Sequence, residues 1–507
     1  MQRTSPFFIK KRTFLFCMML AVLSAQLITR AHAQSFLVKV SQDNFTNSGS
    51  QHRTEVEPDT YSWGSTIVST FQVARNPSSG SPGWGSADIG FSTSTDGGRT
   101  WTNGYLPGLT VNYGNGTYAG ASDPAVAYDA SHGVWLIASL PLVDPIGDIA
   151  VSRSTDGGLT WGNPVVIDST HNDDKGWIVC DNTPTSPYYG HCYVEWDAAA
   201  STGQIKMSTS TDGGRTWGPA LSTADHTTGL GGQPLVQPNG TVIVPFTNGG
   251  MYAFISTDGG ASWSSTYTIS GYVPYHSTAG GFRTFLLPSA EIDASGNIYV
   301  TWMDCRFRSG CTSNDIVMST SSDGKNWSSP ARIPIDPVSS TVDHFIPGLG
   351  VDHATAGSSA HLTLVYYYFP VANCSASSCR LYVGYLVSSD GGSSWTAAKS
   401  LAGPMQLNWL PDSDLGKMVA DYISTSYVKG NAYSVFAVAY PLYTALFNEA
   451  MYTTPRPLTA SPDEPRFSSR NEVPIPGARC DHEPRLCYDD ECRYPIPPWK
   501  QYHPGDN

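Results

Sequence analysis

Charged side chains are scarce in this 507-residue chain, where Asp, Glu, Lys and Arg together make up 14%. A typical soluble domain holds about 25%. Lys and Arg number 29 against 42 for Asp and Glu, which gives a formal net charge of −13. So acidic a chain argues against nucleic acid as a partner. Coiled coils and charge-driven disorder are excluded, whereas 49 Gly, 36 Pro and 12% aromatic residues suit short strands joined by many turns.

Long apolar segments are also missing beyond the N-terminus. Basic residues between Arg3 and Arg12 precede an apolar run from Phe14 to Ile28 and a small-x-small site that ends at Ala33. This pattern predicts a secretory signal peptide over residues 1–33. The alternative, a transmembrane anchor, needs about 20 apolar residues, and the run is shorter. We therefore expect a secreted protein, extracellular or periplasmic, that does not insert into a membrane.

All cysteines except Cys17 follow the signal peptide, so export would place them in an oxidising compartment. Their spacing predicts three local disulfides, Cys180–Cys192, Cys305–Cys311 and Cys374–Cys379. An odd set remains in the tail and leaves one thiol unassigned: Cys480, Cys487 and Cys492. A zinc site that joins these cysteines to His482 lacks the usual paired spacing. We expect no metal and no cofactor.

A short motif recurs six times and is the strongest signal in the sequence. Its first copy, Ser94 to Trp101, reads STDGGRTW, and the other copies begin at Ser154, Ser210, Ser256, Ser321 and Ser388. Each copy follows a short strand of alternating polarity. The motif predicts a tight turn in which the Asp carboxylate accepts backbone N–H bonds of its own loop. The Gly pair supplies positive φ angles, and the Trp covers the turn.

The six copies resemble the Asp-box, or bacterial neuraminidase repeat (BNR), of the sialidase-like superfamily, over residues 35–453. In that family the Asp-box joins the two outer strands of each propeller blade, on the face away from the catalytic site. The resemblance implies an all-β fold, a single β-propeller. It also implies that the Asp-box aspartates are structural, because a motif present once per blade serves the blade.

Each repeat has the order inner strand, second strand, third strand, Asp-box and outer strand. In the second unit these strands are expected at 124–129, 134–139, 148–152 and 165–167. A last unit without a box, at 418–422, 432–440 and 449–453, raises the count to seven blades, with six, the number in sialidases proper, as the alternative. We expect Phe36–Val40 to complete the last blade and close the ring. The predicted organisation is a signal peptide (1–33), the propeller (34–453) and a Pro/Cys-rich extension (454–507).

The functional site is expected on the face opposite the Asp-boxes. Loops that enter the inner strands and loops that leave the second strands share that face of a propeller. There we predict Asp304 and Asp343 as catalytic acid/base residues. The predicted substrate-binding residues are Asp174, Lys175, Trp177, Arg283, Arg306 and His344.

The resemblance implies an exo-sialidase-like glycoside hydrolase that acts on extracellular glycans. A sialidase needs an arginine cluster for the substrate carboxylate, a Tyr–Glu pair and an Asp acid/base. The F/Y-R-I-P element of the family is absent before the first box, and the similar Ala331–Pro334 follows the fifth box. A broader glycosidase, a non-catalytic propeller that binds glycan or protein, and a cell-surface structural protein stay open as alternatives. We expect a monomer whose partner is an extracellular glycan or polysaccharide.

Overall fold

The computed structural model describes residues 37–77, 84–144, 146–459 and 465–468. Within these ranges the chain forms β-strands and no α-helix, which confirms the all-β prediction. The only helical turns of the described residues are four short 3-10 helices: η1 (Ala279–Gly281), η2 (Ser309–Cys311), η3 (Gly357–Ser359) and η4 (Leu407–Trp409). The predicted signal peptide and the three tail cysteines lie outside the described residues.

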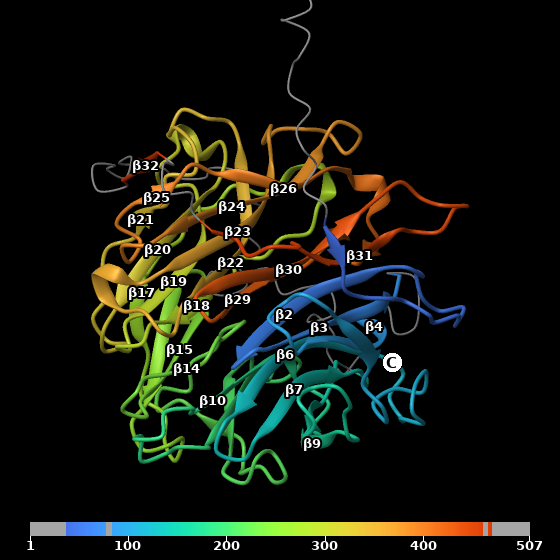
Figure 1. The fold of residues 1–507 in the computed structure, drawn as a ribbon, viewed down its shortest axis with the longest axis vertical. Helices are drawn as coiled ribbons and strands as arrows, with labels where there is room; N and C mark the ends of the chain where they lie inside the picture. The colour runs from blue at the N-terminus through green and yellow to red at the C-terminus, as the bar shows by residue number, and fades with distance from the viewer. Residues whose placement is uncertain (1–36, 78–83, 145, 460–464, 469–507) are drawn as a thin grey trace, which may run out of the picture. The chain divides into compact units, whose positions relative to one another are not determined.

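The strands form successive antiparallel sheets in a propeller arrangement (Figure 1). The first sheet has eight strands: β2 (Glu55–Trp63), β3 (Thr66–Arg75), β4 (Ser86–Ser94), β5 (Thr102–Tyr105), β6 (Ala121–Asp129), β7 (Val134–Pro141), β8 (Ile149–Ser154) and β9 (Val165–Asp168). Two four-stranded sheets follow: β10 (Asp174–Cys180), β11 (Cys192–Asp197), β12 (Ile205–Ser210) and β13 (Leu221–Ser222), then β14 (Leu235–Val236), β15 (Val242–Thr247), β16 (Met251–Ser256) and β17 (Tyr267–Ser270).

Three further four-stranded sheets complete the arrangement. Two of them are β18 (Ser289–Ile292), β19 (Ile298–Asp304), β20 (Asp315–Ser321) and β21 (Ala331–Arg332), and β22 (Asp343–Val351), β23 (Leu362–Phe369), β24 (Arg380–Ser388) and β26 (Lys399–Gln406). The last is β29 (Ser424–Val428), β30 (Asn431–Ala439), β31 (Glu449–Thr453) and β1 (Val38–Lys39). Two short pairs lie outside the sheets, β25 (Trp395–Thr396) with β32 (Arg466–Phe467) and β27 (Asp412–Ser413) with β28 (Gly416–Lys417).

The number of separate four-stranded sheets is five, which differs from the predicted seven and from the alternative of six. The first two expected units are joined into one sheet, because Ser86 on β4 pairs with Ala121 on β6. This single pair carries the hydrogen-bond ladder from one unit into the next. The strands of the second unit themselves lie where the sequence placed them, within a few residues at each end.

The predicted closure by the N-terminal segment is confirmed for its described part. Val38 pairs with Thr453 and Lys39 with Tyr452, so β1 forms the outer edge of the last sheet. The first strands of successive units contact one another in the order β2, β6, β10, β14, β18, β22 and β29, and β29 contacts β2 again. In Figure 1 the red-orange β30 and β31 accordingly lie beside the blue β2.

The inner strand of the last unit is not at residues 418–422, as the sequence suggested, but at β29 (Ser424–Val428). Met418, Val419 and Ala420 are buried like strand residues, yet they belong to the loop that enters the sheet. Val419 uses its carbonyl to accept a bond from the backbone N–H of Glu57. Neighbouring units bury this loop, so its residues are apolar, and its sequence resembles that of a buried strand.

The Asp-box turns have the predicted geometry. Asp96 Oδ1 accepts the backbone N–H groups of Arg99 (3.0 Å) and Thr100 (2.9 Å), and Asp96 Oδ2 accepts the Thr100 hydroxyl at 2.6 Å. These bonds, the Thr100 hydroxyl first, lower the pKa of Asp96 to about 2. Gly97 and Gly98 have φ angles of 75° and 85°. In each antiparallel sheet the third strand ends where the first strand ends, so the boxes lie opposite the starts of the inner strands.

The second glycine of the box also makes contact with the preceding unit. A Cβ added at Gly98 would lie 2.7 Å from the ring of Tyr433 on β30, and one at Gly158 would lie 2.7 Å from Val68 on β3. Both positions also have positive φ. A side chain is therefore excluded twice, by backbone conformation and by the close approach of the neighbouring sheet.

The three predicted disulfides are confirmed. The bonded pairs are Cys180–Cys192, Cys305–Cys311 and Cys374–Cys379. Cys180 and Cys192 are partners in the β10–β11 ladder. The described part of the C-terminal extension contributes β32, whose Phe467 pairs with Trp395 at the end of the sixth Asp-box.

Candidate functional site

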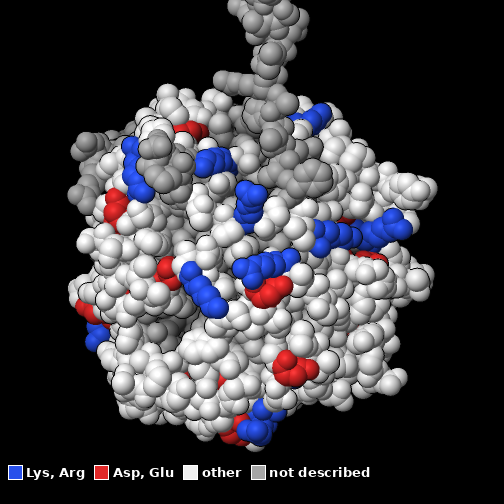
Figure 2. All heavy atoms as spheres, viewed as in Figure 1, with Lys and Arg blue, Asp and Glu red and all other residues white. Residues whose placement is uncertain are grey.

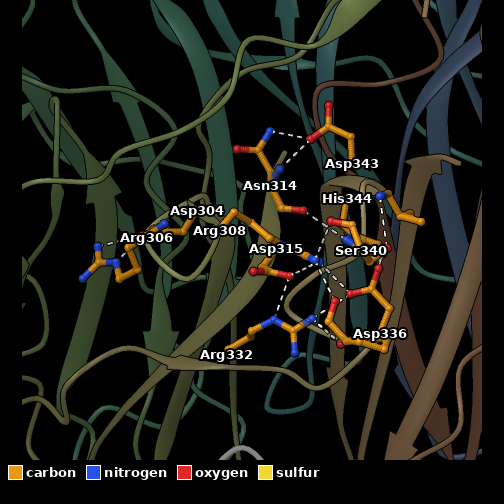
Figure 3. Close-up of polar contacts among 12 residues, drawn as sticks. Asp304, Arg306, Arg308, Asn314, Asp315, Arg332, Asp336, Ser340, Asp343 and His344 are labelled. Carbon is orange, nitrogen blue, oxygen red and sulfur yellow. Dashed lines mark hydrogen bonds and ion pairs between the residues drawn. The ribbon is translucent and has the colours of Figure 1, made fainter. Parts of the chain in front are cut away.

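The two predicted catalytic aspartates are completely buried, with an exposed fraction of 0% each. Asp304 ends β19, and its carboxylate accepts bonds from the backbone N–H and the Nε of Arg306, each at 2.8 Å (Figure 3). It also accepts the indole N–H of Trp302 at 3.1 Å. Burial raises the pKa of Asp304, and Arg306 opposes that rise. The guanidinium group of Arg306, which was predicted to bind substrate, is thus bound by the carboxylate of Asp304, the predicted catalytic acid.

Asp343 begins β22 and lies in a different network. Its Oδ1 accepts the backbone N–H of Asn314 at 2.7 Å and the side-chain amide of Asn314 at 2.9 Å. Its Oδ2 lies 3.4 Å from Nδ1 of His276. His344 is almost fully buried, and burial lowers its pKa to about 4, so its imidazole is neutral at pH 7. Asn314 and His276 engage the Asp343 carboxyl, and the two ring nitrogens of His344 face the carbonyl of Asn314 and the carboxylate of Asp336.

Beside these residues lies an ion-pair cluster that the sequence did not indicate. Arg308 and Arg332 each bind both Asp315 and Asp336, and all four side chains come from the fifth unit (Figure 3). The carboxylates of Asp315 and Asp336 and the imidazole of His344 are close enough together to hold a metal ion. Two guanidinium groups already bind these carboxylates, so we assign the cluster to structure. Arg332 belongs to the Ala331–Pro334 segment, whose arginine is therefore not a substrate ligand.

A second group of ionisable residues, here called the axial cluster, forms where the inner strands begin: Glu57, Asp123, Lys175, Arg283 and Asp421. Glu57, Asp123 and Lys175 lie at equivalent points of β2, β6 and β10, where the ladder register shifts. All three have positive φ angles, 56°, 46° and 51°. Such backbone strain in non-glycine residues is concentrated at functional sites. The bulges turn three ionisable side chains from three inner strands toward one another.

Lys175 is the cation at the centre of the axial cluster. Its Nζ lies 3.6 Å from Asp123 Oδ1, 3.4 Å from the centroid of the Tyr422 ring and 5.0 Å from that of Trp177. The two rings meet edge to face, with centroids 5.0 Å apart. Among the described residues, Nζ has no hydrogen-bond partner, although Lys175 is only 6% exposed. An ammonium group therefore keeps donors available in a partly aromatic setting.

Arg283 fixes the carboxylate of Asp421. Its Nε and Nη2 donate to the two oxygens of Asp421 at 2.9 Å and 2.5 Å, and its Nη1 lies 3.4 Å from Asp414. Burial by itself would raise the pKa of Asp421, but the charge and hydrogen bonds of Arg283 lower it below the usual value. Asp421 is thus held in its ionised form.

Glu57 has the opposite tendency. Burial, followed by the negative charges of Asp123 and Asp421, raises its pKa well above the usual value. Gln72 donates to its carboxyl group, and a hydrogen bond from Glu57 helps to keep Asp421 ionised. The pKa values of Glu57 and Asp421 are therefore shifted in opposite directions within one cluster. Neighbouring carboxyl groups whose pKa values are pushed apart are suited to act as a general acid and a general base or nucleophile.

The structure thus brings together three of the predicted site residues, Lys175, Trp177 and Arg283, with Asp174 adjacent to Lys175. It does not bring Asp304, Arg306, Asp343 or His344 into the axial cluster's ion pairs. Asp421 escaped prediction because its segment was taken for a strand. A signal for Glu57 and Asp123 was present, since Glu57-Pro58 and Asp123-Pro124 recur at the same point of two units.

On the face that Figure 2 shows, Lys and Arg residues stand singly or in small groups between wide areas of uncharged residues, and several have an acidic neighbour. This distribution agrees with the low charge content of the chain. The described residues include no helix long and apolar enough to cross a bilayer.

Residues 146–348 match the family model of the BNR repeat-like domain. No curated protein matches the chain. Similar solved structures include a protein of unknown function from Dyadobacter fermentans, with 15% identity over 69% of this chain and 98% of that chain and a TM-score of 0.43. An ulvan lyase has 11% identity over 82% of this chain and 96% of its own, with a TM-score of 0.47. The NanB sialidase from Streptococcus pneumoniae has 13% identity over 82% and 70%, with a TM-score of 0.39. Sequence identities of 15% or less and TM-scores below 0.5 support no conclusion about activity.

Proposed function

We propose that this chain, an Asp-box (BNR-repeat) propeller protein, is a secreted glycoside hydrolase whose reaction takes place at the axial cluster. One observation carries the proposal: Glu57 and Asp421 are neighbouring carboxyl groups whose pKa values are shifted in opposite directions. Glycoside hydrolysis needs one protonated carboxyl to protonate the leaving oxygen and one carboxylate as nucleophile or general base. In this proposal Glu57 is the acid and Asp421 the carboxylate.

The other members of the cluster have supporting roles. Arg283 orients Asp421 and keeps it ionised through two hydrogen bonds. Lys175 balances Asp123 and offers its remaining N–H donors to a sugar hydroxyl or glycosidic oxygen. Trp177 and Tyr422 supply aromatic faces of the kind on which sugar rings pack.

The proposal does not extend to sialic acid. Recognition of a sialoside carboxylate requires arginines whose guanidinium groups face the substrate. Arg283 is bound to Asp421 and Asp414, Arg306 to Asp304, and Arg75 to the carbonyl of Gly85. A glycan without a carboxylate at the scissile residue fits this arrangement better.

The test is a hydrolysis screen on plant, microbial and sialylated glycans with the secreted protein. Glu57→Gln and Asp421→Asn are expected to lower kcat by at least about 100-fold, the usual scale for loss of a general acid or base. Asp144→Asn, on an exposed loop, is the matched control and should keep full activity. Asp304→Asn and Asp343→Asn test the roles predicted from the sequence. Activity that survives in Glu57→Gln but is lost in either of these would move the site back to Asp304 and Asp343.

A non-catalytic glycan-binding propeller is the second candidate. It is favoured by the burial of the axial cluster, since Glu57 is 1% exposed and Asp421 6%. Glycan binding by the wild-type protein without turnover of any bound glycan, unchanged in Glu57→Gln, would identify this alternative.

We also infer a count of seven blades, with the eight-stranded sheet serving as two. The support is the ring of seven inner strands in contact, together with the four-strand order in each half of that sheet. Secretion, the monomeric state and the boundaries at residues 33 and 453 remain part of the proposal. Determination of the mature N-terminus by mass spectrometry and of the mass by light scattering tests them.

A further inference from the structure

A cavity of about 290 Å³ runs along the axis of the ring, between the axial cluster and the Asp-box side. The inner strand of every unit contributes to its wall. A ligand site for small molecules has about 300 Å³ or more, and one water molecule takes about 30 Å³, so the cavity is large enough for a small organic molecule. Of its lining residues, the proposed glycosidase mechanism uses only Trp177.

The wall combines aromatic rings with acidic groups. The residues that matter for chemistry are Asp59, Tyr61, Trp63, Trp177, Glu291 and His353. None of the described lining residues is Lys or Arg. Apart from His353, which lies 3.5 Å from Glu291, the described wall offers acceptors and aromatic faces without a basic side chain.

Asp59 is the acidic group in the interior of the cavity. It is 3% exposed, and its Oδ2 accepts the backbone N–H of Val126 at 2.8 Å. Glu291 is more accessible, and His353 lies 3.5 Å from it. His353 pairs with Glu291, whereas Asp59 and Asp293 form no ion pair among the described residues. Asp293 is already bound by the side-chain amide of Asn297 and by the backbone N–H of Gly357.

The protein's own lysine shows how such a wall accepts an ammonium group. In the axial cluster, Lys175 Nζ lies against Tyr422 and Trp177 with Asp123 as its carboxylate. Trp177 also lines the cavity, where Tyr61, Trp63 and Asp59 repeat the combination of rings and a carboxyl. Trp63 is 41% exposed, so part of its side chain is accessible, while its ring also lies 5.3 Å from the ring of Tyr128.

We propose that this cavity is a binding site for a small alkylammonium ion, held by cation–π contact with Trp63 and Tyr61 and by the carboxyl group of Asp59. Aromatic faces together with an anionic group are the chemistry that recognises quaternary ammonium ligands. Glu291 adds negative potential near His353. The site is independent of the axial cluster's proposed reaction.

The experiment is titration calorimetry of the full secreted chain with choline chloride at about pH 8.5, because burial raises the pKa of Asp59 to about 7 and the group is ionised above that pH. Two uncharged compounds serve as comparisons: 3,3-dimethylbutan-1-ol, which has the shape of choline without its charge, and methyl β-glucoside. Choline is expected to bind at least about tenfold more tightly than its uncharged analogue, since a charge-assisted contact is lost in the analogue. Equal affinity for the two, tighter binding of the glucoside, or no binding of choline would overturn the proposal.

Variants locate the binding. Asp59→Asn keeps the shape and the acceptor for Val126 and should weaken choline binding by about tenfold, whereas Trp63→Ala should weaken it by about threefold or more. Asp144→Asn removes an exposed carboxylate on the loop between β7 and β8 and should leave affinity unchanged. If Asp59→Asn does not fold, the choline affinities of Trp63→Ala and Glu291→Gln test the site instead. Choline affinity within twofold of wild type in both would refute the site.

Discussion

Lys175 and Asp123 occupy equivalent bulges of neighbouring inner strands, and Lys175 Nζ lies 3.6 Å from Asp123 Oδ1. The two residues are 52 positions apart, yet each has a positive φ angle and each is less than a tenth exposed. A pair of this kind is stabilising only as a pair, because removal of one partner leaves the other charge buried.

Lys175→Met is therefore expected to lower the free energy of unfolding by about 3 kcal/mol, measured in urea at pH 7. The buried carboxylate of Asp123 would lose its cation. The double variant Lys175→Met/Asp123→Asn should recover part of this loss, since the uncompensated charge is then gone. Strictly additive effects of the two substitutions would show that the pair is not coupled.

The raised pKa of Asp173 predicts that its contribution to the free energy of unfolding falls as the pH rises. Burial, followed by the negative charge of Asp168, raises its pKa to about 8, from an unfolded value near 4. The folded state then binds a proton more tightly than the unfolded state, so its contribution is fully present below pH 4 and is lost between about pH 4 and pH 8. Asp173→Asn keeps an acceptor for the Trp196 indole, which now donates at 3.0 Å. The change in unfolding free energy caused by Asp173→Asn should be more favourable at pH 8 than at pH 5 by at least about 2 kcal/mol. Urea unfolding of both proteins at both pH values measures this difference. An equal effect at both would contradict the raised pKa.

Asp156 should be needed for stability and not for activity. Its carboxylate accepts bonds from Ser154, from two backbone N–H groups and from the Thr160 hydroxyl. Asp156→Ala is expected to cost about 1–2 kcal/mol of unfolding free energy with kcat unchanged. These bonds hold the pKa of Asp156 at about 2, against the effect of burial, so the wild-type contribution is lost as the pH falls from about 4 to 2.

The control for this prediction is Leu159→Ala, an exposed side chain in the same turn, which should change stability by less than about 0.5 kcal/mol. Loss of activity in Asp156→Ala without loss of stability would reverse the assignment of the Asp-boxes.

The Cys180–Cys192 disulfide should contribute more to stability than the two shorter ones. Its sequence separation is 12, against 6 and 5 for the others. The chain-entropy estimate for a loop of this length is about 3 kcal/mol, and it decreases with the logarithm of loop length. The double serine variant at Cys180 and Cys192 should therefore lower the unfolding midpoint further than that at Cys374 and Cys379. The reverse order, measured by thermal unfolding without reductant, would contradict a loop-entropy origin.

The all-β repeat architecture could be predicted from the sequence because its causes are local. In each Asp-box the Asp carboxylate accepts hydrogen bonds from groups within about seven residues of the same turn. The six copies therefore predict six turns, independent of the rest of the fold. The same holds for the disulfides, whose cysteines lie close together along the chain, and for the pairing of β1 with β31, which follows from a missing outer strand. The fusion of two units through Ser86 and Ala121 has no such local cause and appeared only in the folded sheet.

The candidate site depended on tertiary structure for a different reason. Whether an ionisable residue is exposed, paired or strained depends on strands from other units, and the sequence around Asp304 and Asp343 does not show that Arg306 and Asn314 satisfy their carboxylates. The pKa values of Glu57 and Asp421 diverge because burial and the Arg283 charge act on each to different extents, and Arg283 is 138 residues from Asp421. Local hydrogen bonding determined the repeats, and long-range packing around the axis decided which charges meet.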